Sequence, residues 1–133
     1  MKLHHVGIVT DKKNIKNFFF KKKINQIVVD NFQKNKLLFQ YNTENKFWFE
    51  YVVPLNKDST VYNFLKKKGG GIHHFGYLVE NIHKIKSQYM KNKDYIYLNS
   101  YKINIPCFGG NIETCFFYNN NFIIEFLANV KKK

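Results

Sequence analysis

The chain has 133 residues, of which 44% are hydrophobic and 18% aromatic, so it is long enough to form one compact domain with a packed core. Its formal net charge is +13, but every basic residue is a lysine. The lack of arginine argues against nucleic-acid binding, because bidentate recognition of guanine and phosphate is mainly arginine chemistry. We interpret the charge as lysine on solvated faces, and the alternative is that it attracts an anionic ligand such as a phosphate-bearing substrate.

The sequence contains no apolar run of about 18 residues and no recognisable leader, so we expect no membrane association and a cytoplasmic location. Its two cysteines, Cys107 and Cys115, lack the CxxC spacing of metal motifs and are too few for a disulfide framework. Free thiols fit a reducing compartment. We interpret both as ordinary small hydrophobic residues.

The first part of the chain predicts a strand, a helix and three further strands. The strand over 2–9 ends at Thr10 and Asp11, which are typical of a helix start. Apolar residues at helical spacing predict a helix over 12–23. Alternating and apolar runs then predict strands over 26–30, 35–41 and 46–53, the last ended by Pro54.

A connecting segment follows Pro54. Ser59 is the expected cap of a short helix that runs through Lys68. The glycines over 69–71 could suggest a phosphate-binding loop, but no lysine followed by serine or threonine comes after them. We therefore interpret them as a flexible linker.

The second part repeats the first. We expect a strand over 72–79, a helix over 81–92, and strands near 94–98, 113–118 and 121–128. The sequence thus predicts an α+β fold of two βαβββ modules in one domain. Module 1 covers about 1–55, the linker helix about 56–71 and module 2 about 72–129. One module alone would expose a sheet face, so the two must pack or pair.

Two segments of the sequence are similar to each other. LHHVGIV begins at Leu3 and IHHFGYLV begins at Ile72, and each is followed by an apolar strand with a single glutamate. The histidines His5 and His74 are 69 positions apart, and the glutamates Glu50 and Glu125 are 75 apart. Self-similarity of this kind indicates two copies of one supersecondary unit.

Strand alternation sharpens the prediction. His5 shares its strand face with Gly7, and His74 shares its face with Gly76, where the missing side chain leaves room for an ion and a ligand. A carboxylate flanked by bulky apolar neighbours is costly to bury unpaired, and metal coordination would remove that cost. We therefore predict that His5, Glu50, His74 and Glu125 are ligands of one metal ion. His4 and His73 fall on the opposite faces and are interpreted as structural.

These residues carry a resemblance to the vicinal oxygen chelate superfamily, which includes glyoxalase I, methylmalonyl-CoA epimerase, ring-cleaving dioxygenases and drug-sequestering resistance proteins. The closest resemblance is to methylmalonyl-CoA epimerase. It rests on the segment EYVVPL from Glu50, on DSTV from Asp58, on FL from Phe64 and on GIHH from Gly71. The resemblance extends over about 3–128, and the central segment is its most specific part.

The resemblance implies two βαβββ modules that form a cupped mixed sheet around one divalent metal ion. It implies the ligand set His5, Glu50, His74 and Glu125, with Glu50 where the family has Gln or Glu. Such a set suits Co, Ni, Mn or Zn. The reaction removes a proton α to a thioester carbonyl, with Glu125 as both ligand and acid/base. We expect a small-molecule substrate such as an acyl-CoA or another anionic thioester, and a homodimer.

The second catalytic base is the point at which the sequence departs from the family. Racemisation needs a proton relay on both faces of the carbon, and the only acid in the matching region of 29–34 is Asp30. Gln33 cannot act as a base. Asp30 is therefore the candidate second catalytic residue, and its alternative interpretation is a turn residue.

Two further functions remain open. A glyoxalase I-type lactoylglutathione lyase would use the same ligands, although no arginine is present to bind glutathione carboxylates. A non-catalytic, ligand-sequestering protein of the resistance type is the other alternative, and the missing second base is its best support. A ring-cleaving dioxygenase fits least, because those proteins usually carry extra modules and three ligands. Fold alone does not choose among these functions.

Overall fold

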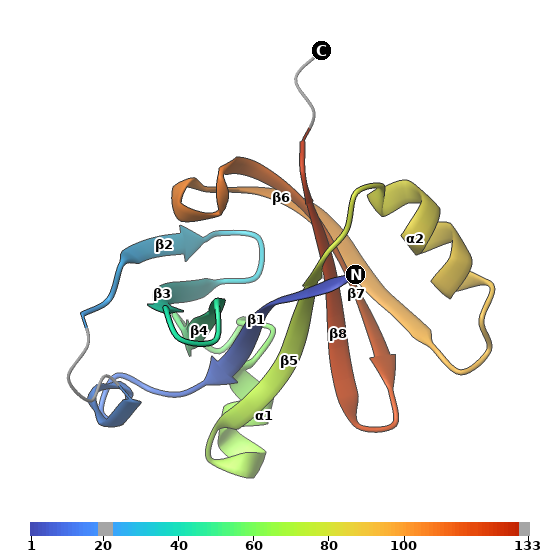
Figure 1. Cartoon of the computed structure of the whole chain (residues 1–133). Helices are drawn as coiled ribbons and strands as arrows, with labels where there is room; N and C mark the ends of the chain where they lie inside the picture. Colours follow the sequence, from blue (N-terminus) through green and yellow to red (C-terminus); the bar gives the residue numbers. More distant parts are fainter. Residues whose placement is uncertain (19–22, 131–133) are drawn as a thin grey trace. The chain divides into compact units, whose positions relative to one another are not determined.

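The protein is an α+β structure, seen here in a computed structural model that describes residues 1–18 and 23–130 (Figure 1). The chain divides into two compact units. One unit is His5–His73, called the first half below. The other consists of Met1–His4 together with His74–Lys133 and is called the second half. The predicted α+β class is confirmed, and each half contains the predicted run of four strands.

In the first half the strands follow the order β2-β3-β4-β1. Strand β1 is parallel to β4, whereas β3 is antiparallel to both β2 and β4. The described residues of this half also include a 3₁₀ helix and a short α-helix. The elements are β1 (Lys2–Val9, from His5 onward in this half), η1 (Ile15–Phe18), β2 (Gln26–Asp30), β3 (Asn35–Asn42), β4 (Phe47–Pro54) and α1 (Tyr62–Lys68).

The helix predicted over 12–23 is wrong in its described part. Only the 3₁₀ helix η1 forms there, and residues 19–22 lie outside the described residues. Asp11 accepts hydrogen bonds from the backbone N–H groups of Lys13 and Asn14 at 3.0 and 2.7 Å, as a helix cap would. However, no residue of η1 is buried, and helices gain most of their stability from burying an apolar face.

The connecting segment is more ordered than its sequence predicts. Helix α1 begins at Tyr62. Ser59 lies in the turn before it, and its hydroxyl oxygen accepts a hydrogen bond from the Val61 N–H at 3.1 Å. Gly69 ends the helix in the left-handed conformation, with its N–H donating to the Leu65 carbonyl. At Gly70 (φ 101°) an added Cβ would lie 2.7 Å from the Val9 carbonyl oxygen. The linker glycines therefore occupy fixed positions that other residues would strain.

In the second half the strands follow the order β5-β8-β7-β6, with β5 parallel to β8 and the other neighbours antiparallel. The elements are β5 (Gly71–Leu78, from His74 onward in this half), α2 (Ile82–Met90), β6 (Ile96–Ile105), η2 (Pro106–Phe108), β7 (Gly110–Asn119) and β8 (Phe122–Asn129). Asn81 caps α2 by accepting from the Lys84 N–H at 3.1 Å.

Strand β6 extends seven residues beyond the predicted end at 98, as far as Ile105. The polar residues Lys102 and Asn104 make this stretch look like a loop, but both are exposed and alternate with more buried neighbours. Such alternation is what a strand with one solvated face requires.

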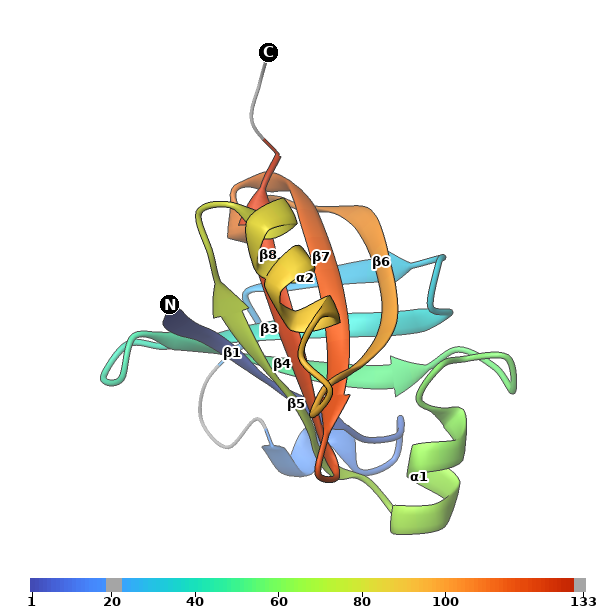
Figure 2. The ribbon, with the colours of Figure 1, turned by 90° about the vertical axis from the view of Figure 1, so that its right-hand side faces the viewer.

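Each half has one face packed against helical residues. In the first half, Ile8, Tyr51 and Val53 are buried with Ile15 and Phe18 of η1 against them. In the second half, α2 lies against β7 and β8 (Figure 2), and Ile82 is buried with Cys115, Phe117, Phe126 and Ala128. Tyr51 and Phe126, the bulky apolar residues that follow Glu50 and Glu125, thus lie on the faces that helical residues cover. Burial raises the pKa of the Cys115 thiol to about 11, in keeping with an inert core residue. Within the described residues, no helix is long and apolar enough to cross a bilayer.

Candidate metal centre

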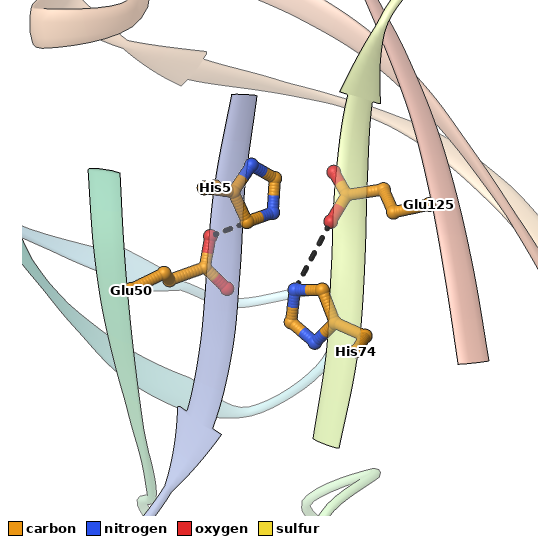
Figure 3. A group of neighbouring side chains, drawn as sticks. All are labelled: His5, Glu50, His74 and Glu125. Atoms are coloured by element: carbon orange, nitrogen blue, oxygen red, sulfur yellow. Dashed lines mark ion pairs between the residues drawn. The ribbon is translucent and has the colours of Figure 1, made fainter. Parts of the chain in front are cut away.

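The first half contains one histidine–glutamate pair on adjacent parallel strands. In the β1–β4 ladder, Gly7 lies opposite Glu50, and His5 lies two residues before Gly7. The His5 side chain is fully buried, and Glu50 is 6% exposed. Nε2 of His5 and Oε2 of Glu50 are 3.7 Å apart (Figure 3). The glycine makes this approach possible, because no side chain stands between the carboxylate and the first strand.

The second half contains the same arrangement. In the β5–β8 ladder, Gly76 lies opposite Glu125, and His74 lies two residues before Gly76. His74 is 4% exposed and Glu125 is 7% exposed. Nε2 of His74 and Oε1 of Glu125 are 3.3 Å apart (Figure 3). The two ladders therefore have the same register, as the sequence repeat predicts.

Thr114 is a residue of the second pair that sequence reasoning missed. It lies on β7 and is 1% exposed. Its hydroxyl is 2.7 Å from Oε2 of Glu125, to which it donates, and 3.2 Å from the Phe126 carbonyl oxygen. Because Oε2 is held in this way, Oε1 is the oxygen turned toward His74. A signal exists in the sequence, since Thr114 alternates with Ile112 and Phe116 on one strand face and is the polar residue among them.

The donor chemistry of the two pairs fits a divalent metal ion. His5, Glu50, His74 and Glu125 are all buried, and each offers a nitrogen or oxygen atom that could hold a metal ion. Imidazole nitrogens and carboxylate oxygens suit first-row divalent metals. Buried carboxylates beside histidines are also costly to leave without a cation. The residues present therefore fit the metal that the sequence predicts.

The two neighbouring histidines have different surroundings. The ring of His4 meets Phe108 edge to face, with centroids 4.3 Å apart, in the second half. The ring of His73 meets Phe64 in the same geometry at 5.0 Å in the first half. Both histidines are half-buried, and these packing contacts agree with their structural interpretation.

Asp30 lies at the end of β2 and is 1% exposed. Its Oδ1 accepts hydrogen bonds from the N–H groups of Phe32 and Gln33, both at 3.0 Å. In the sheet register Asp30 lies opposite Asn35, which lies opposite Pro54. Pro54 is four residues beyond Glu50, so Asp30 is displaced from the level of Glu50 by roughly 13 Å along the strand direction. These contacts are those of a turn residue.

Comparisons with known proteins identify the fold. No protein-family model matches the sequence, and no curated protein matches it. Among solved structures, a hypothetical protein BH1468 from Bacillus halodurans C-125 is similar at 24% identity. The match covers 99% of this chain and 96% of that one, with a TM-score of 0.78.

Methylmalonyl-CoA epimerases are also similar in structure. The enzyme from Mycobacterium tuberculosis matches at 16% identity over 97% of this chain and 88% of its own, with a TM-score of 0.76. A variant of the Streptomyces coelicolor enzyme in complex with 2-nitronate-propionyl-CoA matches at 15% identity over 98% and 99%, also with a TM-score of 0.76. The chain thus shares the fold of these methylmalonyl-CoA epimerases.

Proposed function

We propose that this protein is a metal-dependent epimerase or isomerase that removes a proton α to a thioester carbonyl, similar to methylmalonyl-CoA epimerase. The observation that carries the proposal is the pair of buried histidine–glutamate sets at identical register in the two halves. Burying two carboxylates on the sheet faces is costly, and a bound cation would offset their desolvation.

The four residues His5, Glu50, His74 and Glu125 would hold one divalent ion, with Co, Ni, Mn and Zn as the candidates. When bound, such an ion would act as a Lewis acid on the substrate's carbonyl oxygen and make the α-proton more acidic. The chain supplies the rest of the chemistry. The burial of all four side chains excludes water, which strengthens the interactions of any charge that develops during the reaction.

Glu125 is the proposed base. Its Oε2 accepts from Thr114, so the carboxylate has a fixed orientation while Oε1 remains on the side of His74. A base must hold its position relative to the carbon it deprotonates. The Thr114 contact supplies that position without using the oxygen that faces His74.

The proposed substrate is a small acyl thioester, such as an acyl-CoA or another anionic thioester. Two observations support this class. Solved structures of the same fold include epimerase complexes with 2-nitronate-propionyl-CoA and with methylmalonyl-CoA. The formal charge of +13 would also attract an anionic ligand. A homodimer and a cytoplasmic location stay predictions.

A one-base reaction is the second candidate. Asp30 is the candidate second base, but its Oδ1 accepts two backbone hydrogen bonds in a turn. If Asp30 serves only that turn, Glu125 would exchange the α-proton from one face, as an isomerase or a glyoxalase I-type lyase does. A ligand-sequestering protein would exchange no proton at all.

The deciding experiment measures deuterium uptake from heavy water. The protein, loaded in turn with each candidate metal, would be incubated with 2-methyl acyl thioesters and with hemithioacetals. Uptake with racemisation supports the epimerase, and uptake without racemisation supports the one-base reaction. No uptake in either class, with metal bound, would overturn the enzymatic proposal in favour of sequestration.

A further inference from the structure

The side-chain oxygen of Asn99 on β6 is buried, and within the described residues it accepts no hydrogen bond. It is the one buried side-chain polar atom in that part of the chain without a partner. An unpaired buried acceptor costs free energy, because it has lost its water and gained nothing in return. A buried acceptor without a partner is rare in folded proteins. One explanation is that a ligand donates a hydrogen bond to it when the ligand binds.

A β-bulge directs Asn99 to its present face. Tyr97 lies opposite Phe117 on β7, but Asn99 lies opposite Phe116, so Leu98 is an extra residue in the ladder. Without the bulge Asn99 would lie opposite Cys115, whose side chain packs with α2. The bulge therefore moves the amide from the helix-covered face to the other one. Bulges commonly redirect a side chain in this way beside binding sites.

The redirected amide lies in the same row as the proposed base. Glu125 on β8 lies opposite Phe116, and Phe116 lies opposite Asn99. Residues opposite one another in an antiparallel ladder share a face, so all three side chains point to the same side. Two strand spacings separate Glu125 from Asn99, about 10 Å. The equivalent row of the first half runs from Glu50 through Phe39 to Gln26 and also ends in an amide.

Aromatic side chains lie between Glu125 and Asn99 in this row. The Phe116 ring stacks on Tyr101, with centroids 6.1 Å apart and planes 8° apart, and it meets His74 edge to face at 5.9 Å. An apolar chain laid over Phe116 would run from the side of Glu125 to Asn99. Asn99 as a whole is half-exposed, so part of the residue lies at the surface although its side-chain oxygen is covered.

We propose that Asn99 binds the arm of the thioester substrate by accepting a hydrogen bond from the first amide N–H after the sulfur. The inference rests on the proposed function and adds a contact to it. An unpaired acceptor requires a donor, and the acyl end of a thioester offers only acceptors. In a cysteamine-type arm the first donor is the amide N–H, which follows the sulfur and two methylene groups. The distance from the acyl group to this N–H is compatible with the separation of about 10 Å between Glu125 and Asn99. The acyl group would lie at Glu125 and the arm would lie across Phe116.

The test pairs one protein change with one ligand change. Binding of S-propionyl-N-acetylcysteamine would be compared with that of an S-alkyl propionyl thioester of equal length that lacks the amide, by calorimetry on the metal-loaded protein. Asn99→Ala should weaken binding of the amide-bearing thioester by about 3- to 10-fold and leave the other unchanged. Asn104→Ala is the matched control, because Asn104 lies on the same strand and makes an exposed hydrogen bond to Asn111. It should change neither affinity.

A stability measurement separates binding from folding. Removing an unpaired buried amide should leave the melting temperature of the ligand-free protein unchanged or raise it. A lower melting temperature with an equal loss of affinity for both thioesters would show a structural role and overturn the proposal. Equal affinities of the parent for the two thioesters would also overturn it, while leaving the proposed function intact. Failure of the metal-loaded parent to bind either thioester would overturn both.

Discussion

The two halves of the molecule have the same ladder register and yet support their carboxylates differently. Glu125 lies opposite Phe116, and two residues before Phe116 is Thr114, whose hydroxyl donates to Glu125. Glu50 lies opposite Phe39, and two residues before Phe39 is Leu37, which has no donor to offer. The repeat therefore preserves the histidines and glutamates that could bind metal. It differs at the neighbouring strand position, which is Thr114 in the second half and Leu37 in the first. This difference suggests unequal tasks, with Glu125 as ligand and base and Glu50 as ligand alone.

The largest expected effect concerns whether the two halves share one ion. Chelation should lower the melting temperature by about 10 °C, because an ion bound only by the folded state stabilises it. His5→Ala and His74→Ala should each reproduce most of that loss and reduce the bound metal from one ion per chain to nearly none. Differential scanning fluorimetry and elemental analysis of natively purified protein measure the two quantities.

His73→Ala is the matched control, since His73 packs against Phe64 and is proposed to have no metal contact. It should retain the metal. The comparison between the halves would fail if His5→Ala kept a full ion while His74→Ala lost it, because the second half alone would then be the site.

The next effect separates the two carboxylates. Glu125→Gln should reduce α-proton exchange by about 10²- to 10⁴-fold and keep some metal, because an amide oxygen can coordinate but cannot accept the proton. Glu50→Gln should retain most of the exchange, in line with the resemblance that allows Gln at this position. Deuterium uptake per bound metal ion is the measurement. A similar loss of exchange in both variants would contradict the division of tasks.

The repeat made much of this arrangement predictable. Alternation on the first and fifth strands placed His5 and His74 beside glycines and on the face away from the helical residues, and the registers of both ladders agree. Such patterns are local and recur twice, so a single sequence carries them. The helix predicted over 12–23 rested on apolar spacing alone, and that spacing does not ensure burial: no residue of η1 is buried.

Two other residues could not be predicted in this way. Thr114 meets Glu125 only because β7 and β8 pair in one register, and the spacing along either strand does not reveal that register. Asn99 faces the same side only because of the extra residue Leu98 in β6. Both depend on pairing between strands, which alternation within one strand does not specify.

The third prediction tests the support behind Glu125. Thr114→Val keeps the shape of the side chain and removes the donor, so the affinity for metal should fall by about 10-fold or more, as for other changes behind a metal ligand. Thr114→Ser should restore most of it. Leu37→Val is the matched change in the first half and should leave metal affinity nearly unchanged, because no hydrogen bond is lost there. Competition with a chromogenic chelator gives the three affinities, and equal losses at the two positions would remove the distinction between the halves.

The smallest effect concerns Asp30, because the two halves close their outer hairpins differently. The β2–β3 turn is held by the Asp30 carboxylate, which accepts from the N–H groups of Phe32 and Gln33. The β6–β7 turn has no such carboxylate and uses Pro106 with Gly109 in the left-handed conformation. Asp30→Ala should therefore lower the free energy of unfolding by about 1–2 kcal/mol through two lost hydrogen bonds, whereas Asp30→Asn should cost little since its amide oxygen still accepts.

Chemical denaturation measures this stability difference, and the same two variants address catalysis. If Asp30 acts only in the turn, Asp30→Asn should exchange the α-proton of the substrate at the parent rate, and any racemisation by the parent should be unchanged in the variant. A loss of racemisation in Asp30→Asn, with stability and one-face exchange intact, would instead make Asp30 the second base. The first half would then carry a proton-transfer group of its own, and the unequal tasks inferred from Thr114 and Leu37 would apply to the ligands alone.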